Sequence, residues 1–157
     1  MPEGASISRI ESWLARGGQP VRDDYGRLYE SGIRLVVNLR KNHDEAADIE
    51  RHAPRLTSLR IPVRNDRAPS DEQAEKWLAL CEAARGQLPI YVHCHEGHGR
   101  TSVFCGLVRI AQGWDLERIF AEERGYDFDP DKQKEQAAFI RRFAEDVKAG
   151  RRHAPSL

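Results

Sequence analysis

Apolar and polar positions along the chain follow patterns that predict short buried strands between amphipathic helices. Apolar runs or strict alternation predict strands over residues 34–39, 57–61 and 90–93. Apolar side chains at helical spacing predict helices over residues 21–31, 44–52, 70–86, 101–112, 116–124 and 131–149. The third of these helices has a clear start, because Ser70 is followed three residues later by Gln73, the pattern of a capping box.

The order of these elements indicates the architecture. Strands that alternate with helices favour an α/β sandwich of three layers, in which helices flank a mainly parallel central sheet. We expect a single domain over residues 1–157, with residues 150–157 forming a frayed, solvent-exposed tail. In such sheets ligands bind beyond the carboxyl ends of the strands. The residues that follow strands 57–61 and 90–93 are therefore expected to meet above one pocket.

The composition argues against several classes of function. Apolar residues make up 39% of the 157 residues and charged residues 32%, and the formal net charge is zero, so there is no global field suited to nucleic acid. No segment approaches the roughly 20 apolar residues of a membrane-spanning helix, and residues 1–6 lack the apolar core of a signal peptide. We expect a cytoplasmic monomer with no nucleic-acid partner and no membrane span.

The three cysteines fall into two groups. Cys81 and Cys105 lie within apolar helical patterns, which predicts that they are small buried core residues. An odd, widely spaced set does not form a disulfide framework and fits a reducing compartment. Cys94 differs because it follows a predicted strand and stands in a glycine-containing segment.

That segment, His93 to Ser102 (HCHEGHGRTS), carries the clearest functional signal. Five residues, two of them glycines, separate Cys94 from Arg100, and an apolar helix follows. A loop of this kind can turn its backbone N–H groups into one cup, which binds a tetrahedral oxyanion at the helix N-terminus. Arg100 adds a planar, two-pronged donor that suits phosphate. The same positive field favours the thiolate of Cys94, which is the nucleophilic form.

Two other interpretations of this segment are weaker. A buried structural cysteine would need neither the two glycines nor the hydroxyl pair that follows Arg100. Cys94 and the three histidines near it are donors that zinc accepts, but a second, distant pair of ligands is missing and Arg100 would repel a cation. The pattern favours a catalytic thiolate in a phosphate cup, with no metal and no cofactor.

The segment resembles the signature loop of the cysteine-dependent protein tyrosine phosphatase superfamily, in its small atypical dual-specificity branch. Residues 17–20 (GGQP) and 32–40 are similar to the N-terminal half of these phosphatases. Residues 61–70 are similar to their general-acid loop. The resemblance covers residues 13–143, and the signature loop is its most specific part.

The resemblance implies phosphoryl transfer in two steps from a phosphorylated protein or a small phosphomonoester. Cys94 attacks the phosphorus, and Asp66 gives a proton to the leaving oxygen. Asp66 then activates the water that hydrolyses the phosphocysteine, while the Thr101 hydroxyl hydrogen-bonds the sulfur. The phosphate-binding residues that the resemblance implies are His95, Glu96, Gly97, His98, Gly99 and Arg100.

The identity of the general acid leaves alternatives open. Asn65 falls where some branches of the superfamily place the aspartate. Asp71 is nearby, although its place in the first turn of a helix suits a role in stabilising the helix dipole. Gln136 lies in a segment similar to a late family motif and is a weak candidate for orienting water.

The substrate class also remains open at this stage. The long recognition insert of classical tyrosine phosphatases is missing, which favours a compact enzyme that acts on phosphotyrosine and also on phosphoserine and phosphothreonine. The alternatives are a phosphoinositide or inositol-polyphosphate phosphatase, a rhodanese-like sulfurtransferase and a non-catalytic, phosphate-binding docking module.

Charged side chains near the loop bear on this choice. His95 and His98 take positions where lipid and inositol-phosphate phosphatases often carry lysines, and histidine there is a weaker, pH-dependent anion contact. Glu96 between them opposes a highly anionic substrate. The arginines expected to line the mouth and to offset Glu96 are Arg40, Arg64 and Arg67.

Overall fold

A computed structural model describes residues 5–157, and a sheet of five strands in the order β1-β2-β5-β3-β4 lies at its centre. The strands are β1 (Ile7–Glu11), β2 (Leu14–Gly17), β3 (Leu35–Arg40), β4 (Thr57–Val63) and β5 (Ile90–His93). β1 runs antiparallel to β2, and the other neighbouring pairs are parallel. The mainly parallel sheet expected from the sequence is confirmed.

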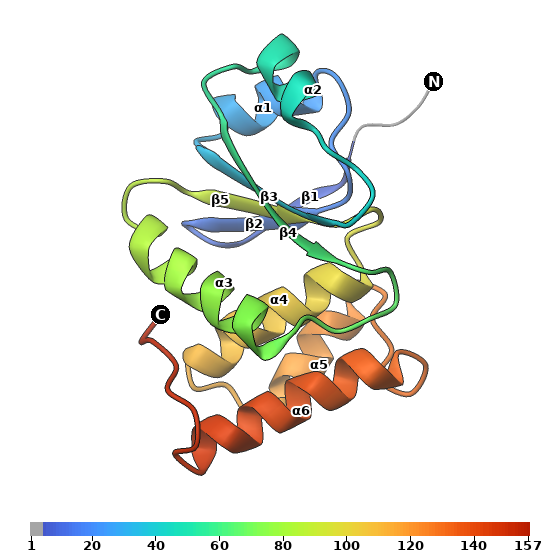
Figure 1. Ribbon diagram of the computed structural model, residues 1–157, viewed down its shortest axis with the longest axis vertical. Coiled ribbons are helices and arrows are strands. Elements are labelled where there is room, and N and C mark those ends of the chain that lie inside the picture. The colour runs from blue at the N-terminus through green and yellow to red at the C-terminus, as the bar shows by residue number, and fades with distance from the viewer. Residues whose placement is uncertain (1–4) are drawn as a thin grey trace.

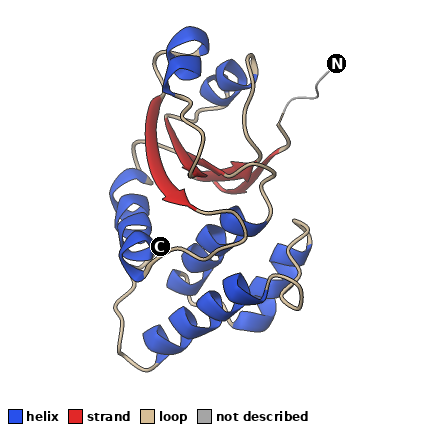
Figure 2. Cartoon of the chain, turned by 45° about the vertical axis from the view of Figure 1, so that its right-hand side comes forward, coloured by secondary structure: helices blue, strands red, loops and turns tan. Residues whose placement is uncertain are grey.

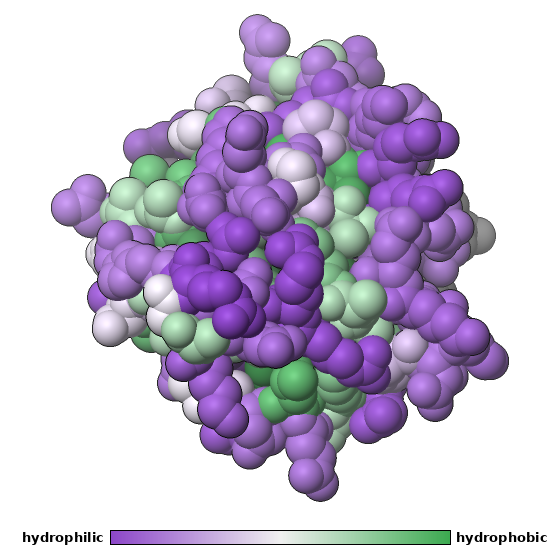
Figure 3. All heavy atoms as spheres, turned by 60° about the horizontal axis from the view of Figure 1, so that its bottom comes forward, coloured by the Kyte–Doolittle hydropathy of each residue, from purple (hydrophilic) through white to green (hydrophobic). Residues whose placement is uncertain are grey.

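Helices cover both faces of this sheet (Figures 1 and 2). On one face lie α1 (Asp24–Glu30) and α2 (Ala46–His52). On the other lie α3 (Asp71–Ala84), α4 (Gly99–Ala111), α5 (Leu116–Arg124) and α6 (Lys134–Lys148). The three-layer α/β sandwich is therefore confirmed. The helices turn polar side chains outward, and the face shown in Figure 3 is mostly hydrophilic with scattered apolar residues.

The central strands have a buried core on each side, because successive side chains of a strand point to opposite faces of the sheet. In β5, Tyr91 belongs to the smaller apolar cluster with residues of α1 and α2, whereas Ile90 and Val92 belong to the larger cluster with residues of α3–α6. Strands that are buried on both faces are continuous apolar runs in sequence. This is why β3 and β5 were readily predicted.

The first two strands were not predicted. β1 has half-exposed side chains at the edge of the sheet, and β2 is four residues long, so neither gives a long apolar run or a regular alternation.

The predicted start of α3 is confirmed in detail. Ser70 Oγ accepts a hydrogen bond from Gln73 N (3.1 Å), and Gln73 Oε1 accepts one from Ser70 N (3.0 Å).

The prediction of a frayed tail over residues 150–157 is wrong. Arg152 reaches the carboxylates of Asp71 (3.2 Å) and Glu75 on α3, and Leu157 packs against the larger apolar cluster. Figure 1 shows the C-terminus beside α3. Two acidic side chains on a distant helix thus hold a segment whose own sequence contains no periodic signal.

In the described part of the chain, no helix is both long and apolar enough to cross a membrane.

Candidate active site

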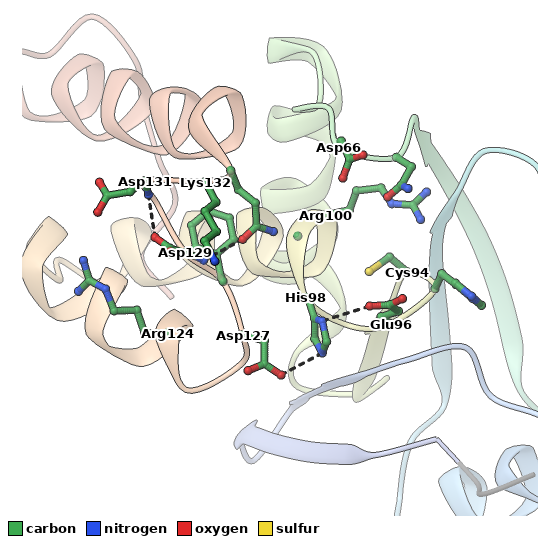
Figure 4. Close-up of a pocket in the computed structure, with 15 residues that line it drawn as sticks. Asp66, Cys94, Glu96, His98, Arg100, Arg124, Asp127, Asp129, Asp131 and Lys132 are labelled. Atoms are coloured by element: carbon green, nitrogen blue, oxygen red, sulfur yellow. Dashed lines mark hydrogen bonds and ion pairs between the residues drawn. The ribbon is translucent and has the colours of Figure 1, made fainter.

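The signature loop, defined here as residues 94–100, leaves the end of β5 and enters the first turn of α4. A pocket of about 840 Å³ opens above it. Figure 4 shows Cys94, Arg100 and Asp66 on one side of this pocket and Asp127, Asp129 and Asp131 on the other. The ends of β4 and β5 therefore deliver residues to the same pocket, as the sequence predicts.

Cys94 lies at the floor of the pocket and is 3% exposed. Its Sγ accepts a hydrogen bond from Thr101 Oγ1 at 3.0 Å and another from Gly97 N at 3.3 Å. Both groups donate toward the sulfur, which is the arrangement that a thiolate needs. The contact expected between Thr101 and the sulfur is present.

Three backbone carbonyls of the signature loop are tied down by donors outside it. The pairs are Cys94 O with His93 Nδ1 (3.0 Å), His95 O with Gln19 N (2.9 Å) and Gly97 O with Arg16 Nη2 (3.1 Å). In a planar trans peptide the N–H points away from the C=O. The N–H groups of residues 95, 96 and 98 therefore point to the opposite side, and none of them donates to an acceptor within residues 5–157. These free amides form the anion cup.

One glycine of the loop is required by its geometry, and a second lies close to the side chains of α6. Gly97 has φ of +85°, and a Cβ built on it would lie 2.6 Å from the carbonyl carbon of Gly17, so both the backbone angle and the space exclude a side chain. A Cβ on Gly99 would lie 2.7 Å from Gln136 Oε1. Gly97 and Gly99 let the loop pack directly against β2 and α6.

A buried ion pair supports the loop from below. Arg16 on β2 and Glu123 on α5 are both 0% exposed and are paired with each other. Arg16 also donates to Ser102 Oγ (2.8 Å), and its guanidinium lies 3.7 Å from the centre of the Tyr126 ring. Arg16 thus connects β2, α5 and α4 to the carbonyl of Gly97.

A second buried carboxylate anchors the residue before Cys94. Glu45 is 1% exposed and accepts hydrogen bonds from His93 Nε2 (2.7 Å), the Tyr25 hydroxyl (2.6 Å) and Gln19 Nε2 (3.1 Å). Burial alone would raise the pKa of Glu45, but hydrogen bonds, that from His93 foremost, hold the pKa below its ordinary value. The ionised carboxylate fixes the ring of His93, which in turn holds the carbonyl of Cys94.

Arg100 is 7% exposed and lines the pocket beside Cys94. Its Nη1 donates to the carbonyl oxygen of Val63 at the end of β4 (2.9 Å), which orients the guanidinium plane. No carboxylate within residues 5–157 forms a salt bridge with it. The remaining N–H groups of Arg100 are thus available to a phosphate.

The candidate acids separate clearly in space. Asp66 and Asn65 line the pocket. Asp66 has φ of +64°, a left-handed conformation that aspartate tolerates better than most residues. Asp71 lies elsewhere, where it pairs with Arg142 (2.7 Å), and this hydrogen bond lowers the pKa of Asp71. Asp71 therefore belongs to the helix start and not to the pocket.

The remaining predicted residues are placed as follows. His98 lies between Glu96 (3.4 Å) and Asp127 (3.5 Å), and His95 is exposed at the rim. Gln136 is 1% exposed and donates to the carbonyl of Arg67 (3.1 Å), while its Oε1 has no partner in the described residues. Within residues 5–157, no group of three histidine, cysteine or acidic side chains is arranged to hold a metal ion.

Two further predictions have opposite outcomes. Cys81 and Cys105 are buried, as expected, and burial raises the pKa of Cys105 to about 12. Arg67 does not line the mouth, because it pairs with Glu135 on α6 (2.9 Å), so that part of the prediction is wrong. No sequence pattern indicates the supporting roles of Arg16, Glu123 and Glu45.

Comparisons with known proteins agree with this geometry. Residues 13–113 match the family described as "Polymorphic toxin system, DSP-PTPase phosphatase". The dual specificity protein phosphatase TpbA of Pseudomonas aeruginosa (strain UCBPP-PA14) is 29% identical over 138 residues, which are 87% of this chain and 62% of that protein. The chain therefore spans less than two thirds of the length of this relative.

Solved structures show the same fold. The crystal structure of P. aeruginosa TpbA matches with a TM-score of 0.75 and 28% identity, over 86% of this chain and 83% of that chain. A cysteine-to-serine variant of TpbA in complex with phosphotyrosine matches with a TM-score of 0.73 and 26% identity, over 89% and 90% of the two chains. The chain belongs to the DSP-PTPase phosphatase family, within the cysteine-dependent protein tyrosine phosphatase superfamily.

Proposed function

We propose that this protein hydrolyses phosphomonoesters, with phosphotyrosine as its substrate group, through a phosphocysteine intermediate. The observation that carries the proposal is the set of three loop carbonyls held from outside, which leaves three free amides around Cys94. The complex of the TpbA variant with phosphotyrosine supports the choice of substrate.

In the first step, Cys94 Sγ attacks the phosphorus in line with the leaving oxygen. The free amides and Arg100 hold the three equatorial oxygens, so the positive charge of the cup is already in place when negative charge develops. Asp66 gives its proton to the leaving oxygen, and a positioned acid of this kind contributes about 10²–10⁴-fold to the rate.

In the second step, water attacks the phosphocysteine and the sulfur leaves as a thiolate. Asp66 takes the proton from the water, and the hydroxyl of Thr101 donates to the departing sulfur. The unpartnered Oε1 of Gln136 lies close to the loop at Gly99, which supports a role in orienting this water.

The test is hydrolysis of p-nitrophenyl phosphate and of phosphotyrosyl, phosphoseryl and phosphothreonyl peptides. Cys94→Ser should abolish turnover, and Cys81→Ser, a matched change of a buried cysteine outside the pocket, should retain it. Rapid acid quenching of the wild type should trap a phosphorylated protein that the Cys94 variant lacks. Binding of phosphopeptide without any turnover would instead identify a docking module and refute the proposal.

The general acid needs its own comparison. Asp66→Ala should slow hydrolysis of a phosphotyrosyl peptide by about 10²-fold or more and should affect a substrate with a better leaving group less. Asp71→Ala removes an acid outside the pocket and serves as the control. An unchanged rate for Asp66→Ala, together with a loss for Asn65→Ala, would refute the assignment of Asp66.

A catalytic thiolate works only while its sulfur stays reduced. Cys81, Cys94 and Cys105 are all unpaired, which supports a reducing compartment such as the cytoplasm. The monomeric state expected from the sequence stays a prediction.

A further inference from the structure

A second hollow, of about 510 Å³, adjoins the catalytic pocket. It shares Asn65, His95 and Arg100 with that pocket, so one bound molecule can occupy both. The other residues that line it are Arg40, Lys41, Asn42 and Arg64. These come from the end of β3 and from the two loops that follow β3 and β4.

This hollow is strongly basic and has no carboxylate in its lining. Within residues 5–157, no salt bridge involves Arg40, Lys41 or Arg64. Arg40 donates to the amide oxygen of Gln19 (3.1 Å). Burial lowers the pKa of Arg40, and the charge of Arg100 lowers the pKa further. Cations held together without a directly paired carboxylate form a positive potential that an anion relieves.

Acidic side chains gather on the opposite rim of the catalytic pocket. Asp127, Asp129 and Asp131 line it together with Arg124 and Lys132, whereas Glu96 of the signature loop lies on the same side as Cys94. Figure 4 shows the three aspartates across the pocket from Arg100. A compact polyanion that seats one phosphate in the cup would bring others against these three carboxylates, which outnumber the two cations beside them, and like charges oppose that placement. An extended peptide instead can place a single anionic group on the basic side alone.

We propose that the second hollow is a subsite for an acidic side chain that neighbours phosphotyrosine in a protein substrate. The occupant is a carboxylate or a second phosphate group of the same peptide. The proposal rests on the proposed function, because it assigns the substrate class of the same site. It adds a specificity role for Lys41 and Arg64, which are exposed and do not contact Cys94.

The experiment compares phosphotyrosyl peptides that differ only in glutamate or glutamine beside the phosphotyrosine, on either side, at low ionic strength. A third peptide carries phosphoserine at that position and distinguishes a phosphate from a carboxylate. The kcat/KM of the wild type should be about three- to tenfold higher for the acidic peptide, and salt should reduce the preference. The preference should fall to about one in Lys41→Ala/Arg64→Ala. Arg67→Ala removes one positive charge from the loop that holds Arg64, outside both hollows, and should retain the preference.

Each other outcome has a distinct meaning. Equal kcat/KM for the acidic and neutral peptides in the wild type would overturn the subsite and leave the phosphatase activity standing. A preference that survives in the double variant would place the anion elsewhere and would overturn the proposal too. Faster hydrolysis of inositol hexakisphosphate than of either peptide would overturn the peptide as occupant. Failure to hydrolyse any substrate, including p-nitrophenyl phosphate, would remove the proposed function itself.

Discussion

Replacing Arg16 tests whether the cup depends on support from outside the signature loop. The Arg16 side chain is fully buried, pairs with Glu123 and donates to Gly97 O and Ser102 Oγ. Arg16→Met keeps an unbranched apolar stem and removes all of these contacts at once. We expect it to disturb both the stability of the fold and the orientation of the peptide that joins residues 97 and 98.

The stability cost follows from burial. Removing one partner of a buried ion pair leaves an uncompensated charge and costs about 3–5 kcal/mol. A domain of this size has a free energy of unfolding of about 5–15 kcal/mol, so Arg16→Met should remove a large fraction of the stability of the fold. Replacing both charges by apolar side chains is often neutral or even stabilising. We therefore expect Arg16→Met/Glu123→Leu to recover to within about 2 kcal/mol of the wild type.

Activity should not recover in the same way. The double variant still lacks the donor that holds Gly97 O, so the N–H of residue 98 is no longer fixed toward the cup. Loss of one donor to a developing oxyanion costs about 10²–10³-fold in kcat. The amide of residue 98 is displaced here and not deleted, so we expect a smaller loss, of about tenfold or more in kcat/KM. Inhibition by vanadate should weaken in parallel.

The assay is urea unfolding together with p-nitrophenyl phosphate hydrolysis and its inhibition by vanadate. Arg109→Met/Glu11→Gln/Glu122→Leu is the control, because it removes a buried arginine with both of its carboxylate partners at a site that does not contact the signature loop. If the Arg16 double variant folds stably and keeps full kcat/KM and full vanadate affinity, the argument from peptide orientation is refuted.

Three further predictions concern single residues. Because the pKa of Glu45 is held below its ordinary value, Glu45 stabilises the fold above about pH 4.3 and this contribution is lost as the pH falls through its folded-state pKa. Between pH 7 and pH 3 the free energy of unfolding, measured with urea, should therefore fall less for Glu45→Gln than for the wild type. Gly97→Ala should lower kcat/KM by about 10²-fold or more, whereas Gly113→Ala, with a similar φ in open space, should retain activity. Thr101→Ala should slow breakdown of the phosphocysteine more than its formation, so a rapid-quench experiment should show a larger burst.

The parts of the fold that the sequence predicts are those with a local signal. β3 and β5 are buried on both faces and are therefore continuous apolar runs, and Ser70 with Gln73 marks the start of α3 within four residues. The loop between Cys94 and Arg100 is recognisable for the same reason, since an anion cup needs contiguous backbone amides.

The supporting residues have no such signal. Arg16 and Glu123 are 107 positions apart, and Glu45 and His93 are 48 apart. The partners in each pair therefore lie on different elements, and no helical or strand spacing in the sequence connects them. Charged residues are seldom fully buried unless they are paired. A single sequence does not identify the partner, and the default expectation for Arg16 and Glu45 is a place at the surface. Their burial was therefore missed together with the strand that carries Arg16.

The missed β2 strand turns out to shape the active site. It pairs in parallel with β5 and places Gly17 opposite His93, directly before Cys94. Gly17 then contacts Gly97, Arg16 holds the carbonyl of Gly97, and the following segment holds the carbonyl of residue 95. The two hydrogen bonds turn the amides of residues 98 and 96 toward the cup. β2 thus determines the geometry of a loop about 80 residues later, although none of its residues lines the pocket.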